Sequence, residues 1–170
     1  MMMNFTVRHS VKIILLNETD DLLLMRIDDP QTRGVGEDYR GPFWCMIGGQ
    51  IEAGESVLEA AARELFEETG IAEEDVDFGP IVWFGECDLI LYGTPTHIKQ
   101  QFIVARTKKK TLSLANLTRG EAKSVKQLAY FSLHDIINSD EIIYPVLLPA
   151  YLPGIIAGKY SQEPIEIKLS

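Results

Sequence analysis

The sequence contains only two cysteines, Cys45 and Cys87, and three histidines among its 170 residues. Neither cysteine belongs to a Cys-x-x-Cys motif, and no histidine pair lies near either of them. This scarcity argues against a zinc site and excludes a disulfide framework. Because such cysteine usage is typical of a reducing compartment, we expect a cytoplasmic protein.

Positive charge and long apolar runs are scarce as well. Lys and Arg number 16 against 25 Asp and Glu, so the formal net charge is −9, which argues against nonspecific binding to nucleic acid or an anionic membrane. The longest apolar stretch, residues 142–158, is shorter than the roughly 20 residues of a spanning helix and contains three prolines. The run at residues 11–16 is interrupted by Lys12 and predicts a first strand. We therefore expect no nucleic-acid partner and no membrane partner.

Internal repeats, low-complexity tracts and linker-like segments are absent from the sequence, so we expect one domain over residues 1–170. The 46% of hydrophobic and 24% of charged residues are typical of a globular protein. They exclude whole-chain disorder, collagen and coiled coil. A chain of this length buries a core without disulfides or structural metals.

Local patterns predict a mixed sheet between helices, and hence an α/β fold. Branched residues at 7–17 and 22–27 predict a hairpin, and the polar segment 28–41 predicts a long loop. Further strands are expected at residues 43–47, 81–92, 97–107 and 128–131. Helices are expected at residues 56–69, 132–138 and 144–157, the last interrupted by its prolines.

The helix at residues 56–69 has the clearest boundaries. Ser56 and Glu59 have the spacing of a capping box, and Gly70 supplies a C-terminal stop. Apolar residues of this segment form one stripe that faces the core. The sequence therefore predicts an amphipathic helix packed on the sheet.

Three glutamates of this helix share one face, because Glu64, Glu67 and Glu68 stand at i, i+3 and i+4. Like charges at this spacing repel, and no Lys or Arg follows three or four residues later to offset them. A solvated helix face is one interpretation. The other is a divalent cation site, since Mg²⁺ takes carboxylates together with substrate phosphates.

The surroundings of the triplet favour the cation. Gly48 and Gly49 precede the helix and allow the backbone to approach a ligand closely. Glu52 and Glu55 add further acids beside the helix start. Arg63 projects sideways from the acidic face, and we expect it to bond loop carbonyls or carboxylates and hold the loop against the helix.

The segment from Gly49 to Ile71 resembles the Nudix box. That pattern is a Gly, five residues, a Glu, seven residues, Arg-Glu, an apolar residue, any residue, Glu-Glu, any residue, a Gly and an apolar residue. This sequence fills it with Gly49, Glu55, Arg63, Glu64, Leu65, Glu67, Glu68, Gly70 and Ile71. Residues 7–27, 43–44 and 128–136 are similar to flanking parts of Nudix domains.

The resemblance to the Nudix hydrolase superfamily implies an α/β/α sandwich with a mixed sheet between helices. It also implies a Mg²⁺-dependent pyrophosphohydrolase, with Mn²⁺ as a substitute, that cleaves a diphosphate bond in a nucleoside diphosphate linked to another group. The substrate is then a small molecule: a nucleoside or deoxynucleoside triphosphate, a nucleotide sugar or a dinucleoside polyphosphate. A homodimer is a further expectation, because Nudix domains often dimerise.

The same resemblance assigns roles within the box. Metal binding falls to the carbonyl of Gly48 and to Glu64, Glu67 and Glu68. Catalysis falls to Glu64, Glu67 and Arg63, with Glu64 or Glu67 also orienting or deprotonating water. Gly49 and Glu55 brace the loop, Glu55 together with Arg63.

Two positions depart from or extend the pattern. Ile47 stands where many family members have a proline before the glycines, which softens the loop entry but removes no ligand. Many members also place an acid in a late loop to complete the metal or base set, and Glu121 is the best candidate here. The alternative is that Glu121 is an ordinary surface-loop glutamate.

Weaker patterns point to substrate contacts outside the box. Arg26, Arg33 and Arg40 lie in or beside the long loop and could grip phosphates. Trp44 and Trp83 could stack on a nucleobase, although aromatic residues on strands are more often core. We consider Arg26, Arg40, Trp44 and Trp83 as candidate substrate-binding residues.

Three alternative functions remain open. A Nudix module without catalysis could bind a nucleotide as a sensor. An enzyme like isopentenyl-diphosphate isomerase would keep the fold and use a cysteine such as Cys45. A Ca²⁺-binding structural domain could use the same acids, although Ca²⁺ loops draw their ligands from a compact polar loop rather than from a helix.

Overall fold

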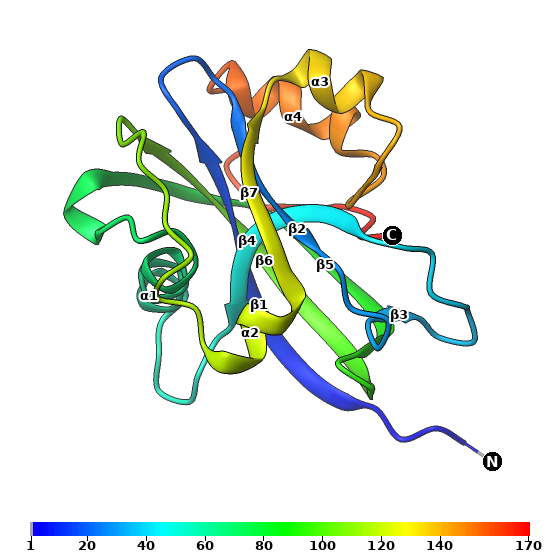
Figure 1. Ribbon diagram of the computed structural model, residues 1–170. Helices are drawn as coiled ribbons and strands as arrows, with labels where there is room; N and C mark the ends of the chain where they lie inside the picture. The colour runs from blue at the N-terminus through cyan, green and yellow to red at the C-terminus, as the bar shows by residue number, and fades with distance from the viewer. Residues whose placement is uncertain (1) are drawn as a thin grey trace.

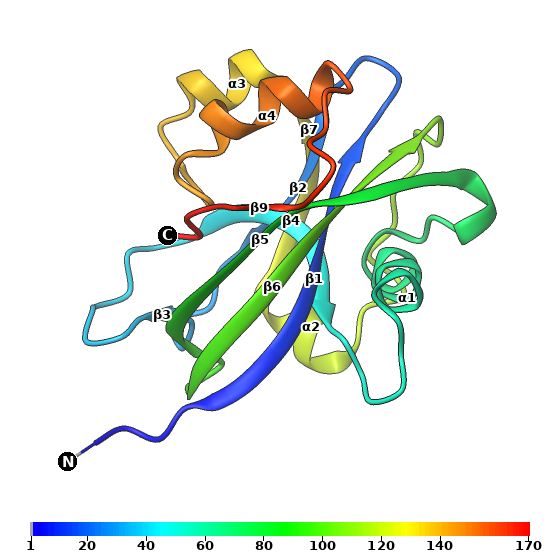
Figure 2. The same ribbon diagram turned by 180° about the vertical axis from the view of Figure 1, so that it is seen from behind.

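The computed structural model describes residues 2–170, apart from the side chain of residue 126; Met1, part of the expected domain, lies outside the described residues. A nine-stranded mixed sheet forms its centre (Figures 1 and 2). Helix α1 packs on one face of the sheet, and α3 and α4 pack on the other. This arrangement confirms the expected α/β class with a mixed sheet between helices.

The sheet is built from two groups of strands that meet at β1 and β4. One group runs β3-β5-β6-β1, in which β1 and β6 are parallel. The other contains β4, β2 and β7 in antiparallel pairs. The strands are β1 Thr6–Leu16, β2 Leu22–Ile27, β3 Arg33–Gly34, β4 Phe43–Gln50, β5 Val76–Leu91, β6 Thr94–Thr107, β7 Val125–Phe131, β8 Ile142–Ile143 and β9 Ile165–Glu166.

The helices are short except for α1, and side-chain caps fix several of their starts. They are α1 Val57–Thr69, the 3₁₀ helix η1 Glu73–Asp75, α2 Arg119–Ser124, α3 Leu133–Asn138 and α4 Leu148–Ile156. The hydroxyl of Ser56 accepts the Glu59 N–H at 3.1 Å, and Gly70 ends α1 in the left-handed conformation. Complete capping boxes start α2 at Thr118 and α3 at Ser132.

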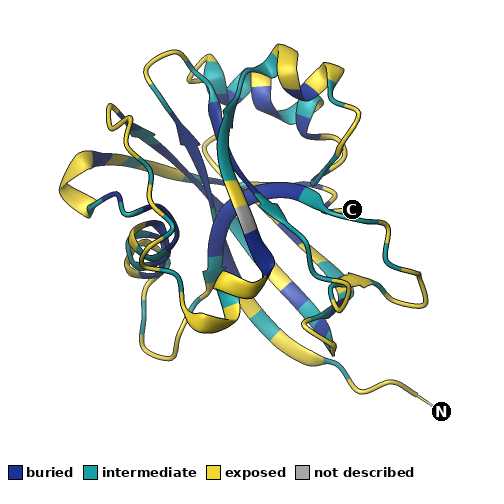
Figure 3. Cartoon of the chain, in the orientation of Figure 1, coloured by how far each residue is buried: buried dark blue, intermediate teal, exposed yellow. Residues whose placement is uncertain are grey.

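Side chains of β1 alternate between two core layers, one on each face of the sheet. Figure 3 shows that the strands between α1 and the α3–α4 pair contain much of the buried chain. Val11, Ile13 and Leu15 pack toward α1, whereas Ile14 and Leu16 pack toward α3 and α4. All five are fully buried. This period-two pattern is that of a strand covered on both faces, and it fixes which β1 side chains face each side of the sheet.

The predicted hairpin is confirmed, since β1 pairs antiparallel with β2. The strand expected from residue 81 starts earlier, at Val76, and the loop at 28–41 contains the two-residue strand β3. The helix expected at residues 144–157 is shorter in the structure, which corrects that prediction. Helix α4 covers only Leu148–Ile156, and Pro153 lies inside the helix without ending it. Helix α2 and strands β8 and β9 were not predicted from the sequence.

Candidate active site

Two glycines at the end of β4 bring the backbone against its neighbours. Gly48 has φ of 145°, in the region that favours glycine, and a Cβ there would collide with the carbonyl oxygen of Val11 on β1. A Cβ on Gly49 would lie 2.5 Å from the carboxylate of Glu64. The β4 end therefore fits closely between β1 and α1 only because neither residue has a side chain.

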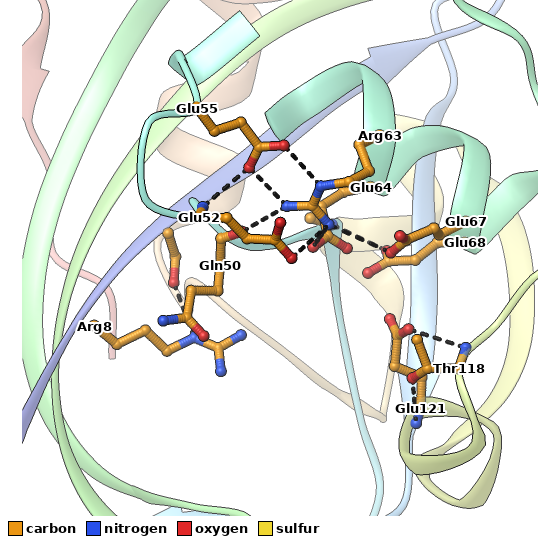
Figure 4. A network of polar contacts seen from close by, with 12 residues as sticks. Arg8, Gln50, Glu52, Glu55, Arg63, Glu64, Glu67, Glu68, Thr118 and Glu121 are labelled. Atoms are coloured by element: carbon orange, nitrogen blue, oxygen red, sulfur yellow. Dashed lines mark hydrogen bonds and ion pairs between the residues drawn. The ribbon is translucent and has the colours of Figure 1, made fainter. Parts of the chain in front are cut away.

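Arg63 of α1 holds the loop between β4 and α1, as its position in the sequence predicts (Figure 4). Its Nε donates to Glu55 Oε2 at 2.8 Å, and its Nη2 donates to Glu55 Oε1 at 2.8 Å and to the carbonyl of Gln50 at 2.9 Å. Glu55 in turn accepts the Glu52 N–H at 3.0 Å. These bonds fasten both ends of the loop to the helix.

The Arg63–Glu55 pair is electrostatically strong. Hydrogen bonds from Arg63 lower the pKa of Glu55 to about 2, and the Glu55 carboxylate raises the pKa of the Arg63 guanidinium above its ordinary value. Both groups therefore stay charged at neutral pH. The loop is consequently braced by a bidentate ion pair under all ordinary assay conditions.

Three carboxylates converge next to this pair. Glu64, Glu67 and Glu121 each offer an oxygen within 4.8 Å of the others, and we call these three residues the carboxylate cluster. Arg63 Nη1 contacts Glu64 Oε1 at 2.8 Å and Glu67 Oε2 at 3.5 Å. Burial raises the pKa of Glu64, although Arg63 opposes that shift.

Glu121 reaches the cluster from α2, a helix far along the chain from α1. The sequence expectation placed it in a loop; the structure corrects this, because Glu121 occupies the third position of a short capped helix. Its Oε1 accepts the Thr118 N–H at 3.2 Å, which orients the carboxylate (Figure 4). The capping box therefore gives the third acid a fixed position.

Glu68 lies beside the cluster but has a different environment. It is 2% exposed, and its Oε2 accepts the Gly48 N–H at 3.0 Å. Burial raises its pKa well above the ordinary value, with Lys12 opposing the shift. Glu68 thus ties α1 to the end of β4, and its role as a metal ligand, like that of the Gly48 carbonyl, stays a prediction.

A cavity of about 920 Å³ opens beside the carboxylate cluster. Residues of the 28–41 loop line it, including Arg33 and Arg40. Arg40 pairs with Glu37 at 3.4 Å. Arg26, in contrast, pairs with Glu141 at 3.4 Å and is not among the described residues that line the cavity. Of the two candidate substrate-binding arginines, Arg26 and Arg40, only Arg40 lines the described cavity.

Neither tryptophan occupies a position suited to base stacking, which corrects that expectation. Trp44 is 3% exposed, packs edge-on against Phe131 and donates its Nε1–H to Glu141 at 2.9 Å. Trp83 is 2% exposed and packs against Phe102. Both rings belong to the core layer under α3 and α4, because strand aromatics pack readily against helices there.

The sequence interpretation missed three cavity residues on β1. Arg8, Ser10 and Lys12 all line the cavity. Their signal was present, since three polar residues at alternate positions share one face of a strand. In the sequence, Lys12 is prominent only because it interrupts the apolar run at residues 11–16.

Comparison with known proteins agrees with the family resemblance of the segment from Gly49 to Ile71. The family model described as NUDIX domain matches residues 6–150. An RNA pyrophosphohydrolase of Cereibacter sphaeroides is 42% identical over 72 residues, which are 42% of this chain and 38% of that relative. The chain thus spans less than half the length of this curated relative.

Solved structures agree on the fold. A NUDIX hydrolase from Nitrosomonas europaea superposes with a TM-score of 0.60 at 19% identity, covering 91% of this chain and 92% of that one. An Ap4A hydrolase from Caenorhabditis elegans superposes with a TM-score of 0.59 at 16% identity, covering 89% of this chain and 96% of that one.

None of the helices within residues 2–170 has the length and apolar character needed to cross a bilayer.

Proposed function

Because this chain belongs to the NUDIX domain family, we propose that it is a Mg²⁺-dependent hydrolase of phosphoanhydride bonds. Its substrate would be a nucleoside diphosphate linked to another group. The observation that carries this proposal is the carboxylate cluster beside a cavity large enough for a nucleotide.

The cluster fits a hard divalent cation. Its three side chains offer carboxylate oxygens, the ligand type that Mg²⁺ and Mn²⁺ prefer, from two helices that hold them in place. Glu64 and Glu67 both pair with Arg63, whose guanidinium is already engaged by Glu55. When bound, the metal would neutralise charge on the phosphate oxygens and polarise the phosphorus for attack.

The chain's own residues would position the reaction. Water would attack one phosphorus, the bridging P–O bond would break, and the water proton would pass to a carboxylate oxygen of Glu64 or Glu67. Arg63 would fix both carboxylates through its Nη1 while Glu55 holds its opposite edge. Because positioning accounts for most of phosphoryl-transfer catalysis, this bracing would matter as much as the ligands.

Two rival functions make different predictions at this site. A nucleotide sensor without hydrolysis would bind substrate and release no product. An isomerase-like use of Cys45 is disfavoured, because that thiol is 9% exposed and burial raises its pKa, which keeps it protonated at neutral pH. A cytoplasmic location and a homodimer stay predictions.

A substrate screen tests the proposal. The purified chain should release phosphate or pyrophosphate, or form a nucleoside monophosphate, from at least one of ATP, GTP, ADP-ribose, ADP-glucose, NADH and diadenosine tetraphosphate with Mg²⁺. The relatives' names place RNA and diadenosine tetraphosphate among the compounds worth including. Activity should persist with Mn²⁺ and disappear with EDTA. Binding of a nucleotide without any product across this panel would favour the sensor.

A further inference from the structure

Arg8 and Lys12 differ from the other cations of the cavity because neither forms a direct ion pair with a carboxylate of residues 2–170. Arg63 and Arg40 are engaged by glutamates, and Arg33 donates to the carbonyl of Glu37 at 3.0 Å. Arg8 donates from Nε to the hydroxyl of Ser10 at 3.2 Å. Lys12 makes no hydrogen bond or ion pair with any residue that the structure describes.

Lys12 interacts electrostatically with the buried Glu68 carboxylate, but no described carboxylate lies within ion-pair distance of its ammonium group. The residue is half-buried, and its neighbours in the sheet are Gly48 on β4 and Phe102 on β6, which is 1% exposed. Desolvating an ammonium group without a partner is unfavourable. Lys12 lines the cavity together with Gly48 and Phe102. An anionic ligand in the cavity would supply the missing partner.

Arg8 lies four residues earlier on the same face of β1, about 13 Å away along the strand. Its bond to Ser10 directs the guanidinium along the strand toward Lys12, and its terminal nitrogens stay available. Figure 4 shows the Arg8 side chain extending toward Gln50, on the side of the site away from Glu121. The two cations and the Ser10 hydroxyl therefore flank one stretch of the cavity wall.

We propose that Arg8, Ser10 and Lys12 form a phosphate subsite that binds a third phosphate of the substrate. This inference rests on the proposed function, in which the two phosphates of the scissile bond lie at the carboxylate cluster. Two further positive charges in a chain of net charge −9 then match an additional phosphate. The substrate class is consequently one with at least three consecutive phosphates, such as a nucleoside triphosphate, rather than a diphosphate-linked sugar.

Direct binding of inorganic tripolyphosphate tests the subsite without requiring hydrolysis. Isothermal titration calorimetry in EDTA at low salt is expected to show binding that is at least ten-fold weaker in Lys12→Met and Arg8→Met. Lys99→Met is the matched control, because Lys99 lies on the adjacent strand β6, is exposed and pairs with Glu86 at 3.6 Å outside this cavity. Its affinity should stay within two-fold of the wild type. Equal affinities in all variants, or no binding by the wild type, would overturn the subsite.

Kinetics separate this inference from the proposed function. Lys12→Met should raise KM for a nucleoside triphosphate at least ten-fold with kcat within about three-fold, and should affect ADP-ribose much less. A fall in kcat at unchanged KM, or an equal effect on both substrates, would contradict a third-phosphate subsite. Tripolyphosphate binding that depends on Lys12 in a chain without hydrolytic activity would support the subsite and refute the hydrolase. Thermal unfolding of Lys12→Met checks that the variant is folded, and a cooperative transition is expected.

Discussion

Replacing Glu67 by glutamine is expected to lower kcat about 10³-fold or more for any substrate that the wild type hydrolyses, because the carboxylate cluster would lose a negative charge that the proposed cation needs. The shape of the side chain is kept, and Glu67 is only half-buried, so the fold should be unaffected. Steady-state kinetics at saturating Mg²⁺ measure the effect, and thermal unfolding checks the fold.

Glu59→Gln is the matched control for this variant. Glu59 belongs to the same helix, is exposed and lies outside the lining of the cavity. Its substitution should leave kcat within two-fold of the wild type. Near-normal turnover by Glu67→Gln with an unchanged melting temperature would remove Glu67 from the catalytic machinery.

Substituting Gly48 by alanine is expected to have the largest effect on stability, lowering the free energy of unfolding by more than about 3 kcal/mol or preventing folding. The added Cβ would collide with the Val11 carbonyl and approach the Lys12 Cα to 2.8 Å, and both are backbone atoms that cannot rotate away. The φ of 145° is also unfavourable for alanine. Urea unfolding followed by circular dichroism measures the loss.

Gly120→Ala serves as the control, because a Cβ at Gly120 meets nothing within 4 Å and the residue lies in helix α2. Its free energy of unfolding should match the wild type or exceed it by about 0.5–1 kcal/mol, the usual gain of alanine over glycine in a helix. A Gly48→Ala protein within about 1 kcal/mol of the wild type would show that β1 and β4 separate easily. The conclusion that the end of β4 packs against β1 only without a side chain at Gly48 would then be wrong.

The features that the sequence predicted best are those that depend on residues close together in the chain. The cap at Ser56, the stop at Gly70 and the shared face of Glu64 and Glu67 depend on residues a few positions apart, and the structure places them as expected. Arg63 and Glu55, which also bond as expected, are separated only by the N-cap and the first turns of α1. Local periodicity and capping therefore predict most of the local structure of the segment from Gly49 to Ile71.

Features that depend on distant segments could not be predicted in the same way. Glu121 joins the cluster only because α2 packs beside β7, and the sequence gives no local sign of that contact. The burial of Trp44 and Trp83 depends on α3 and α4 covering that face of the sheet. Lys12 acquires its importance from Gly48 and Phe102, which belong to two other strands. Tertiary packing thus decides which polar residues face the cavity.

Titration of Mn²⁺, followed by electron paramagnetic resonance, tests most directly whether the carboxylate cluster holds a divalent cation. The wild-type chain should bind Mn²⁺ saturably and release it to excess Mg²⁺. Glu67→Gln and Glu121→Gln should each weaken binding about ten-fold or more, whereas Glu59→Gln should bind as the wild type does. Absence of saturable binding, or equal affinity in all four proteins, would contradict the account.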